Sequence, residues 1–326
     1  MNVTASAPAK VILTGEHFVV YGELAVVMAI DCYAHVTVSE RPDRVVHIVS
    51  DLGISGLYAG NEYSPEKGGP QAKNVLRPVN IAAKTVLDLL EKKTGLEIKV
   101  DSQIPVAAGL GSSGALAVAT VAAVGKLLGT DFSRDELIKL SFDSERFVHF
   151  EPSGIDQTIS SSGGVVVYRK GERLSPIEVK SEIPIVIGNT GIPRKTGDLV
   201  NAVKKRLNDF PEVLEPIVHA AGGLSSWAVK ALLDGNLKRL GELMSINHGL
   251  LSAIGVSNEP LDRLVYAARK AGALGAKLTG AGGGGCMIAL STLEDREKIA
   301  DAIREAGGAA IMAKKTNTGV QVWANE

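Results

Sequence analysis

The stretch Ile104-Pro-Val-Ala-Ala-Gly-Leu-Gly-Ser-Ser-Gly-Ala115 is a loop rich in glycine and serine that separates a strand pattern from a helix pattern. Before it, apolar and charged residues alternate over 96–101, with the period of two that a half-buried strand shows. After it, the alanine-rich residues 115–128 predict a helix. Glycines let main-chain amides approach an anion closely, and a helix N-terminus adds unpaired N–H groups and partial positive charge. The order of strand, glycine loop and helix therefore indicates a site for nucleotide phosphate.

Two other phosphate-binding motifs fit this loop less well. Gly109-Leu-Gly-Ser-Ser-Gly114 has the G-x-G-x-x-G spacing of dinucleotide-binding proteins, but the helix runs into residues 129–133 and a second helix, not into a strand with an acidic end. A Walker A loop would need Gly-Lys-Ser/Thr after the glycines, and the sequence has none there. A tight turn without a ligand is the structural alternative. A dinucleotide-dependent oxidoreductase is a further alternative, which an absence of NAD(H) binding would exclude.

Two other segments give the loop its context. The first is Pro8-Ala-Lys-Val-Ile-Leu-Thr-Gly-Glu-His-Phe-Val-Val-Tyr-Gly22, and the second is Lys277-Leu-Thr-Gly-Ala-Gly-Gly-Gly-Gly-Cys286. Four consecutive glycines cost backbone entropy on folding, so we expect another group to lie close to that main chain. A flexible linker is the alternative, but Leu278 on one side and the apolar run 287–290 on the other make it the weaker interpretation.

These three segments, in this order, resemble the signature motifs of the GHMP kinases, the family of galactokinase, homoserine kinase, mevalonate kinase and phosphomevalonate kinase. The resemblance covers nearly the whole chain and is strongest to the mevalonate kinase branch, which the segment Pro152-Ser-Gly-Ile-Asp-Gln157 also matches. It implies ATP-dependent phosphorylation of mevalonate on its 5-hydroxyl, giving 5-phosphomevalonate and ADP in isoprenoid biosynthesis. ATP and Mg2+ are the cofactors that it implies.

The fold expected is α+β with two domains. Strand and helix patterns mix without regular alternation, and 326 residues exceed what one core usually organises. The resemblance implies a ribosomal-protein-S5-like N-terminal domain over 1–182, with the phosphate loop, Lys10 and Asp156. A ferredoxin-like C-terminal domain would cover 183–326 and hold the third motif. Predicted strands include 3–13, 33–39, 45–50 and 320–324; predicted helices include 79–93, 133–150, 211–233 and 236–253; and 52–70 is the candidate mobile loop or lid.

Composition restricts the partners. Lysine and arginine total 35 against 36 acidic residues, so nothing favours nucleic acid or an anionic membrane as a partner. A buried helix explains the uncharged run 106–125 better than a membrane span does. Cys32 and Cys286 lack zinc-type spacing, which fits buried packing residues in a reducing cytoplasm. We expect a small-molecule substrate, and the resemblance implies a homodimer.

The resemblance assigns roles at the reaction centre. Asp156 is the proposed general base, and Lys10 is expected near the reacting hydroxyl and phosphoryl groups, where it would neutralise developing charge. Glu145, eleven positions before Asp156, would bind Mg2+ with Ser113, or with Ser112 as the reserve. Locally, each of these side chains has an ordinary alternative, such as a helix cap or a solvated surface charge. The expected contacts to the ATP phosphates come from Gly109, Leu110, Gly111, Ser112, Ser113 and Gly114.

The expected substrate contacts are Lys10, Glu16, His17, Asp156 and Arg194. Arg194 would face anionic charge, since a guanidinium suits both phosphoryl and carboxylate groups. The expected loop of the third motif comprises Thr279, Gly280, Ala281, Gly282 and Gly283. His149, one helical turn after Glu145, matches a family histidine and is expected to give structural support.

The chain departs from the mevalonate kinase pattern in two places. Phe150 and Glu151 replace a glycine and a small polar residue, which bears on how a substrate carboxylate is seated, and Gly114 stands where alanine is common. Other GHMP kinases, acting on phosphomevalonate, homoserine or a sugar, are therefore the nearest alternative. A non-catalytic ATP-dependent sensor on the same fold is a second alternative, against which the presence of Lys10, Glu145 and Asp156 argues.

Overall fold

A large mixed sheet forms the framework of the first half of the chain. The computed structural model describes residues 1–60, 62–105, 108–148, 154–193 and 196–325, and the backbone alone for 145–148. The strands of this sheet are β1 (Asn2–Thr14), β2 (Ala25–Arg41), β3 (Val46–Ser50), β4 (Ile54–Ala59), β5 (Glu62–Lys67), β6 (Gly95–Ser102), β7 (Val165–Tyr168), β8 (Ser175–Ile177) and β13 (Gln321–Asn325). Their order is β13-β1-β2-β6-β3-β4-β5, and β7 pairs with both β2 and β8.

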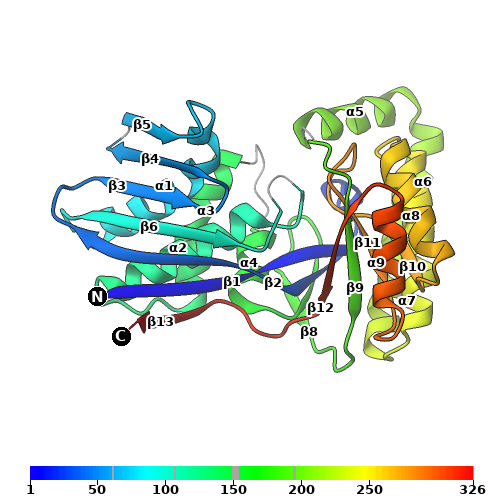
Figure 1. Cartoon of the computed structure of the whole chain (residues 1–326). Helices are drawn as coiled ribbons and strands as arrows, with labels where there is room; N and C mark the ends of the chain where they lie inside the picture. The colour runs from blue at the N-terminus through cyan, green and yellow to red at the C-terminus, as the bar shows by residue number, and fades with distance from the viewer. Residues whose placement is uncertain (61, 106–107, 149–153, 194–195, 326) are drawn as a thin grey trace.

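A smaller antiparallel sheet forms the framework of the second half. Its strands are β9 (Pro184–Asn189), β10 (Gly275–Leu278), β11 (Cys286–Leu290) and β12 (Ala309–Lys314), in the order β10-β11-β9-β12. The helices are η1 (Phe18–Tyr21, 3-10), α1 (Ala72–Leu89), α2 (Ser112–Leu127), α3 (Arg134–Val148), α4 (Ile155–Ser162), α5 (Thr196–Asp209), α6 (Pro211–Leu233), α7 (Leu237–Ala253), α8 (Glu259–Lys270) and α9 (Arg296–Glu305). In Figure 1, α6 to α9 cover the outer face of the small sheet, and β1 and β2 extend towards it from the large sheet.

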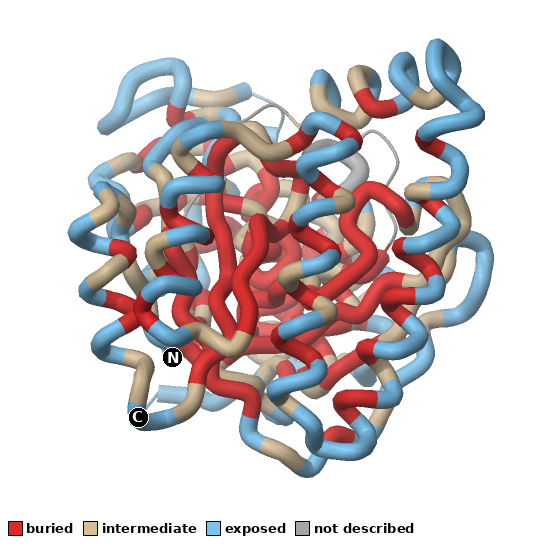
Figure 2. The backbone as a smooth tube through the Cα atoms, turned by 90° about the vertical axis from the view of Figure 1, so that its right-hand side faces the viewer, coloured by how far each residue is buried: buried red, intermediate tan, exposed pale blue. Residues whose placement is uncertain are grey.

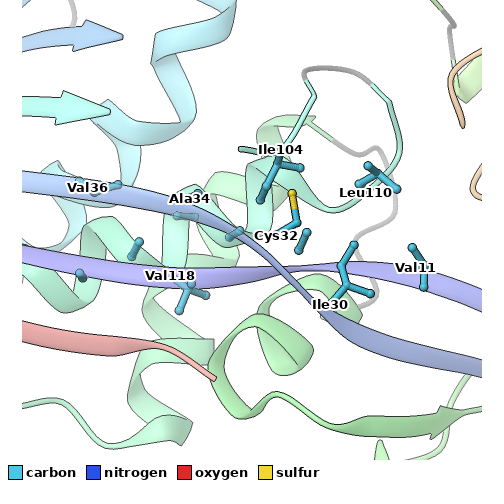
Figure 3. Packing of buried hydrophobic residues seen from close by; sticks show 14 of the residues in the cluster. Val11, Ile30, Cys32, Ala34, Val36, Ile104, Leu110 and Val118 are labelled. Atoms are coloured by element: carbon cyan, nitrogen blue, oxygen red, sulfur yellow. The ribbon is translucent and has the colours of Figure 1, made fainter. Parts of the chain in front are cut away.

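The main core lies between β1, β2 and α2. Residues 3–11 of β1 are all buried, and the small side chains of α2 let this helix pack closely on both strands. Figure 3 shows Cys32, Leu110 and Val118 meeting in this cluster, and Figure 2 shows buried strands behind helices with exposed outer faces. Both cysteines are buried, as predicted, and neither forms a disulfide; burial raises the pKa of Cys32 to about 11.

Several predicted elements agree with the structure. The mixture of sheets and helices confirms the α+β class, and α6 has the predicted bounds. The capping box also forms, because the Ser133 amide donates to Glu136 Oε2 at 2.8 Å and the Glu136 amide donates to Ser133 Oγ at 3.4 Å. The predicted end of this helix, near Phe150, lies outside the described residues. In the described part of the uncharged run 106–125, the predicted buried helix is α2. No described helix is long and apolar enough to cross a membrane.

The predicted mobile loop over 52–70 is wrong. This segment holds β4 and β5, a hairpin that forms the edge of the large sheet. The segment shows little hydrophobic alternation because β5 is mostly exposed. The two strands are nevertheless packed together, since the ring centroids of Tyr58 and Tyr63 lie 4.9 Å apart. A Cβ on Gly56 would meet the Tyr63 ring at 2.5 Å, so this glycine accommodates an aromatic neighbour and does not mark a flexible turn.

The end of the chain departs from the predicted division at residue 182. β9 begins at Pro184, near that point, but β13 returns to the large sheet and pairs with β1 antiparallel from Asn2 to Ser6. Accordingly, the two termini lie side by side in Figure 1. Residues 321–325 therefore pack with the N-terminal half, because the outer edge of β1 needs a hydrogen-bonding partner that only a distant segment supplies.

Candidate active site

The phosphate loop joins β6 to α2 and reaches Lys10 of β1. Gly109 and Gly111 have φ angles of 83° and 76°, a left-handed conformation that residues with a Cβ rarely adopt. Leu110 between them is buried, and its carbonyl accepts a hydrogen bond from the Lys10 amide at 2.9 Å. Because α2 begins at Ser112, the first amides of this helix lack partners within it and carry the partial positive charge of its N-terminus. The local geometry suits an anion.

The glycine loop before α2, the first motif and the third motif all border one cavity of about 650 Å³. This volume is typical of small-molecule sites. Its predicted lining residues are Gly109, Gly111, Ser112 and Ser113 of the loop, Lys10, Glu16 and His17 of the first motif, Gly280 and Ala281 of the third motif, and Asp156 of α4. Segments that are some 270 residues apart in the sequence (residues 10 and 280) therefore meet at one site.

Lys10 and Asp156 form an ion pair inside this cavity. Lys10 Nζ lies 3.2 Å from Asp156 Oδ1, and their side chains are 9% and 14% exposed. Lys10 projects from β1, whereas Asp156 lies in the first turn of the short helix α4. A carboxylate and an ammonium group so close together, beside an anion loop, can serve as a proton acceptor and as a charge stabiliser for one reacting hydroxyl.

Two glycines of the phosphate loop make room for this pair. A Cβ on Gly111 would lie 2.8 Å from Lys10 Cγ, and a Cβ on Gly114 would lie 2.7 Å from Asp156 Cβ. Both distances are shorter than normal van der Waals contact. The absence of side chains at these two glycines therefore allows β1 and α4 to approach the loop closely.

We expect Gly114→Ala to lower turnover. The added methyl group would push α4 and the Asp156 carboxylate away from Lys10 by tenths of an ångström, and misplacements of this order cost about tenfold in rate. Steady-state kinetics would show a lower kcat with little change in nucleotide affinity. Gly249→Ala in α7 is the matched control, since a Cβ there meets nothing within 4 Å. An unchanged kcat in Gly114→Ala would show that α4 yields freely and that this contact does not position Asp156.

The first motif turns sharply after β1 and contacts the second half of the chain. His17 has a φ of 61°, unusual for a residue with a side chain, and its Nε2 lies 2.8 Å from the carbonyl oxygen of Ala281. Glu16 forms a buried ion pair with Lys277, and its Oε2 accepts a hydrogen bond from Asn247 Nδ2 at 3.1 Å. Both residues line the cavity, and their predicted substrate contacts stay predictions.

The four glycines of the third motif thread between other parts of the main chain. All have positive φ, and Cβ atoms on Gly282 and Gly284 would meet the carbonyl oxygens of Val256 and Ile192 at 2.0 and 2.6 Å. The group expected close to this main chain is therefore the protein's own backbone. Gly280 and Ala281, just before the run, are the members that border the cavity. The linker interpretation does not hold, since the loop is tightly packed.

Five predicted residues cannot be placed in the site. The backbone of Glu145 belongs to α3, but its side chain lies outside the described residues, as do His149, Phe150, Glu151 and Arg194. Among the side chains that are described, no cluster of three or more acidic, histidine or cysteine residues could hold a metal ion. Ser113, the other predicted magnesium ligand, lies in the first turn of α2 and lines the cavity.

Sequence reasoning missed the remaining walls of the cavity. One wall comes from the large sheet and α1, and another from η1 and the start of α5. The missed residues are Ile12, Val19, Val20, Ser50, Asp51, Leu52, Asn74, Val75, Leu76, Pro78, Ser102, Ile104, Leu116, Ile155, Thr196, Gly197 and Val200. Most are apolar or small and belong to no motif. Recognising that α1 begins before Pro78 would have brought residues 74–78 into consideration.

Two family models match the chain. Residues 79–164 match the model of the GHMP kinases N terminal domain, and residues 228–309 match that of the GHMP kinases C terminal domain. The chain therefore belongs to the GHMP kinase family, a family of small-molecule kinases.

Within the family, mevalonate kinases are among the similar proteins. The chain is 45% identical to "Mevalonate kinase" of Pyrococcus furiosus, over 99% of this chain and 98% of that protein. It is 44% identical to "Mevalonate kinase" of Pyrococcus horikoshii, over 98% and 97%. Among solved structures, L. major mevalonate kinase in complex with R-mevalonate superposes with a TM-score of 0.85 at 28% identity, covering 96% of each chain.

Proposed function

We propose that this protein catalyses the ATP-dependent phosphorylation of mevalonate on its 5-hydroxyl, giving 5-phosphomevalonate and ADP. The observation that carries the reaction is the Lys10–Asp156 pair at 3.2 Å in the cavity that the phosphate loop borders. The acceptor is supported by mevalonate kinases 44–45% identical over nearly the whole chain. The reaction would belong to the mevalonate pathway.

The nucleotide phosphates would bind at the loop over 109–114. Main-chain amides at the start of α2 would donate hydrogen bonds to phosphate oxygens, and the left-handed glycines remove side chains that would block this approach. The Ser112 and Ser113 hydroxyls line the same cavity and add further donors. This arrangement fixes the terminal phosphoryl group near Lys10.

Asp156 would accept the proton of the acceptor hydroxyl, while the Lys10 ammonium would stabilise negative charge on the attacking oxygen and the transferring phosphoryl group. Their proximity lets one hydroxyl contact both side chains. Because phosphoryl transfer passes through a loose transition state, much of the contribution of Asp156 would lie in orienting the hydroxyl.

Mg2+ is the proposed cation of this site. Mg2+ takes only a few protein oxygens and completes its shell with water and nucleotide phosphates, so the Ser113 hydroxyl and one carboxylate would suffice. Glu145, on α3, is the proposed carboxylate. When bound, the ion would neutralise phosphate charge. His17 and Arg194 are the proposed contacts to the acceptor, and a cytoplasmic homodimer is the proposed state of the protein.

An acceptor panel tests this function. ADP formation would be measured with purified protein, ATP and Mg2+, offering mevalonate, phosphomevalonate, homoserine or galactose, with a reaction lacking any acceptor as the control. We expect turnover with mevalonate far above that control. Turnover with another acceptor alone would show kinase activity but contradict mevalonate as the acceptor. No ADP formation with any of the four acceptors would contradict catalysis on these alcohols.

A further inference from the structure

Glu16 and Lys277 form a fully buried ion pair where the two halves of the chain meet. Glu16 is 1% exposed and Lys277 is 0% exposed, and Lys277 Nζ donates a hydrogen bond to Glu16 Oε1. Glu16 follows β1 of the large sheet, whereas Lys277 belongs to β10 of the small sheet. Lysine is almost never fully buried unless it is paired, and burying two charges costs free energy. We therefore expect this pair to have a role in positioning the residues around it.

The Lys277 ammonium also binds main chain from both halves. It donates to the carbonyl oxygens of Ile12 at 3.3 Å and Leu278 at 2.6 Å. The Ile12 amide in turn donates to Thr279 Oγ1 at 3.2 Å. One ammonium group therefore ties the end of β1 to the beginning of the third motif.

The residues next to this pair border the cavity, but Lys277 does not. We use the term seam wall for His17, Gly280 and Ala281, which line the cavity beside Glu16 where the first and third motifs meet. Within it, His17 Nε2 contacts the Ala281 carbonyl at 2.8 Å. The position of this wall thus depends on the contacts of Lys277, which does not line the cavity.

The hydrogen bonds of Glu16 are made to protein. Oε1 accepts from Lys277, and Oε2 accepts from Asn247 of α7 at 3.1 Å. The pKa of Lys277 lies below its ordinary value, because the lowering effect of burial exceeds the raising effect of the neighbouring Glu16 carboxylate. A buried charge that lost its partner would be costly, so the carboxylate is held to the ammonium and is not available to move towards a ligand.

We propose that Glu16 and Lys277 are a positioning pair, which holds the seam wall in place for the acceptor without contacting it. This proposal rests on the proposed function for its kinetic readout. Glu16 therefore acts through Lys277, and disturbing either member displaces His17 and the Gly280–Ala281 peptide. The rival account is that Glu16 contacts the acceptor directly.

A double-mutant cycle separates these accounts. The variants are Glu16→Gln, which keeps the shape, Lys277→Met, which keeps the length, and the two combined. We expect each single change to lower kcat/KM for mevalonate about 100-fold, and the double variant to lose no more than the worse single variant, because coupled residues are not additive. If the losses multiply, Glu16 acts independently of Lys277 and the proposal fails.

Nucleotide affinity is the second readout. We expect the Kd of a non-hydrolysable ATP analogue, measured by calorimetry, to stay within about threefold of wild type in all three variants, since the described hydrogen bonds of the pair go to residues outside 109–114. A merely structural pair would lower the melting temperature and leave kcat/KM per folded molecule unchanged, and that result would overturn the proposal. A wild-type protein inactive on mevalonate would instead overturn the proposed function.

Asn247→Ser provides a milder variant should Lys277→Met fail to fold. It removes only the hydrogen bond to Glu16 Oε2, from a residue that does not line the cavity. We expect a loss of about tenfold in kcat/KM that disappears in the Glu16→Gln background. Met244→Leu, a buried change one turn earlier in α7, is the matched control and should leave kcat/KM unchanged. A loss that persists in the Glu16→Gln background would contradict the proposal.

Discussion

Asp156→Asn should lower kcat by about three to four orders of magnitude, at the upper end of what a positioned general base contributes. The amide keeps the size of the carboxylate but neither accepts the hydroxyl proton nor pairs as an anion with Lys10 Nζ, 3.2 Å away. The phosphate loop does not depend on this charge, so ATP binding should persist. Rapid-quench single turnovers with saturating ATP and mevalonate would measure the chemical step separately from product release.

The matched control for this prediction is Asp135→Asn, an exposed carboxylate in the first turn of α3. It should turn over at the wild-type rate. If Asp156→Asn also retained near-normal activity, Asp156 would have neither a general-base nor an orienting role. The Lys10–Asp156 pair would then be only a structural contact between β1 and α4.

Lys10→Met should lower kcat about 100- to 1,000-fold, the cost of removing one preorganised charge stabiliser. The methionine side chain occupies a similar volume beside Gly111, where a Cβ would lie 2.8 Å from Lys10 Cγ, so the loop should keep its shape. The variant also leaves the Asp156 carboxylate without its cation, and the loss should therefore appear mainly in kcat. Steady-state kinetics against both substrates would resolve kcat from each KM.

Lys99→Met is the control for Lys10→Met, because Lys99 is an exposed lysine on β6. The double variant Lys10→Met/Asp156→Asn is informative as well. Two residues that act on one hydroxyl form a unit, so the double variant should be little worse than Asp156→Asn alone. Losses that multiply would mean that the two side chains serve separate steps.

The motif residues were predictable because their chemistry requires an unusual local sequence. Gly109 and Gly111 indicate left-handed turns, and four consecutive glycines indicate a crowded main chain. The loop and the third motif can therefore be recognised from the sequence. Their union in one cavity was implied only by family resemblance. No local pattern states that residue 10 meets residue 156.

Other features depend on contacts that the sequence does not display. The helix predicted over 79–93 begins at Ala72 instead and accommodates Pro78 in its interior, and residues of that first stretch line the cavity. The exposed strand β5 carries too little hydrophobic alternation to be recognised. α5, with one buried residue, Val203, has too narrow an apolar face to have been predicted as a helix.

Glu16 shows the same limit at the level of a single residue. Its place in the first motif favoured a substrate contact. The structure pairs it with Lys277, a residue 261 positions later that the sequence presented only as the start of a glycine run. The role of a buried charge follows from its partner, and the partner is set by the fold.

Phosphorus NMR of the reaction of wild-type protein with ATP, Mg2+ and mevalonate tests the central claim most directly. We predict one new phosphomonoester signal, assigned to the 5-position by its coupling to the adjacent methylene protons, growing in step with ADP, and no such signal with Asp156→Asn over the same time. Formation of ADP with free phosphate and no phosphomonoester, or a phosphoryl group on any other oxygen of mevalonate, would contradict the account.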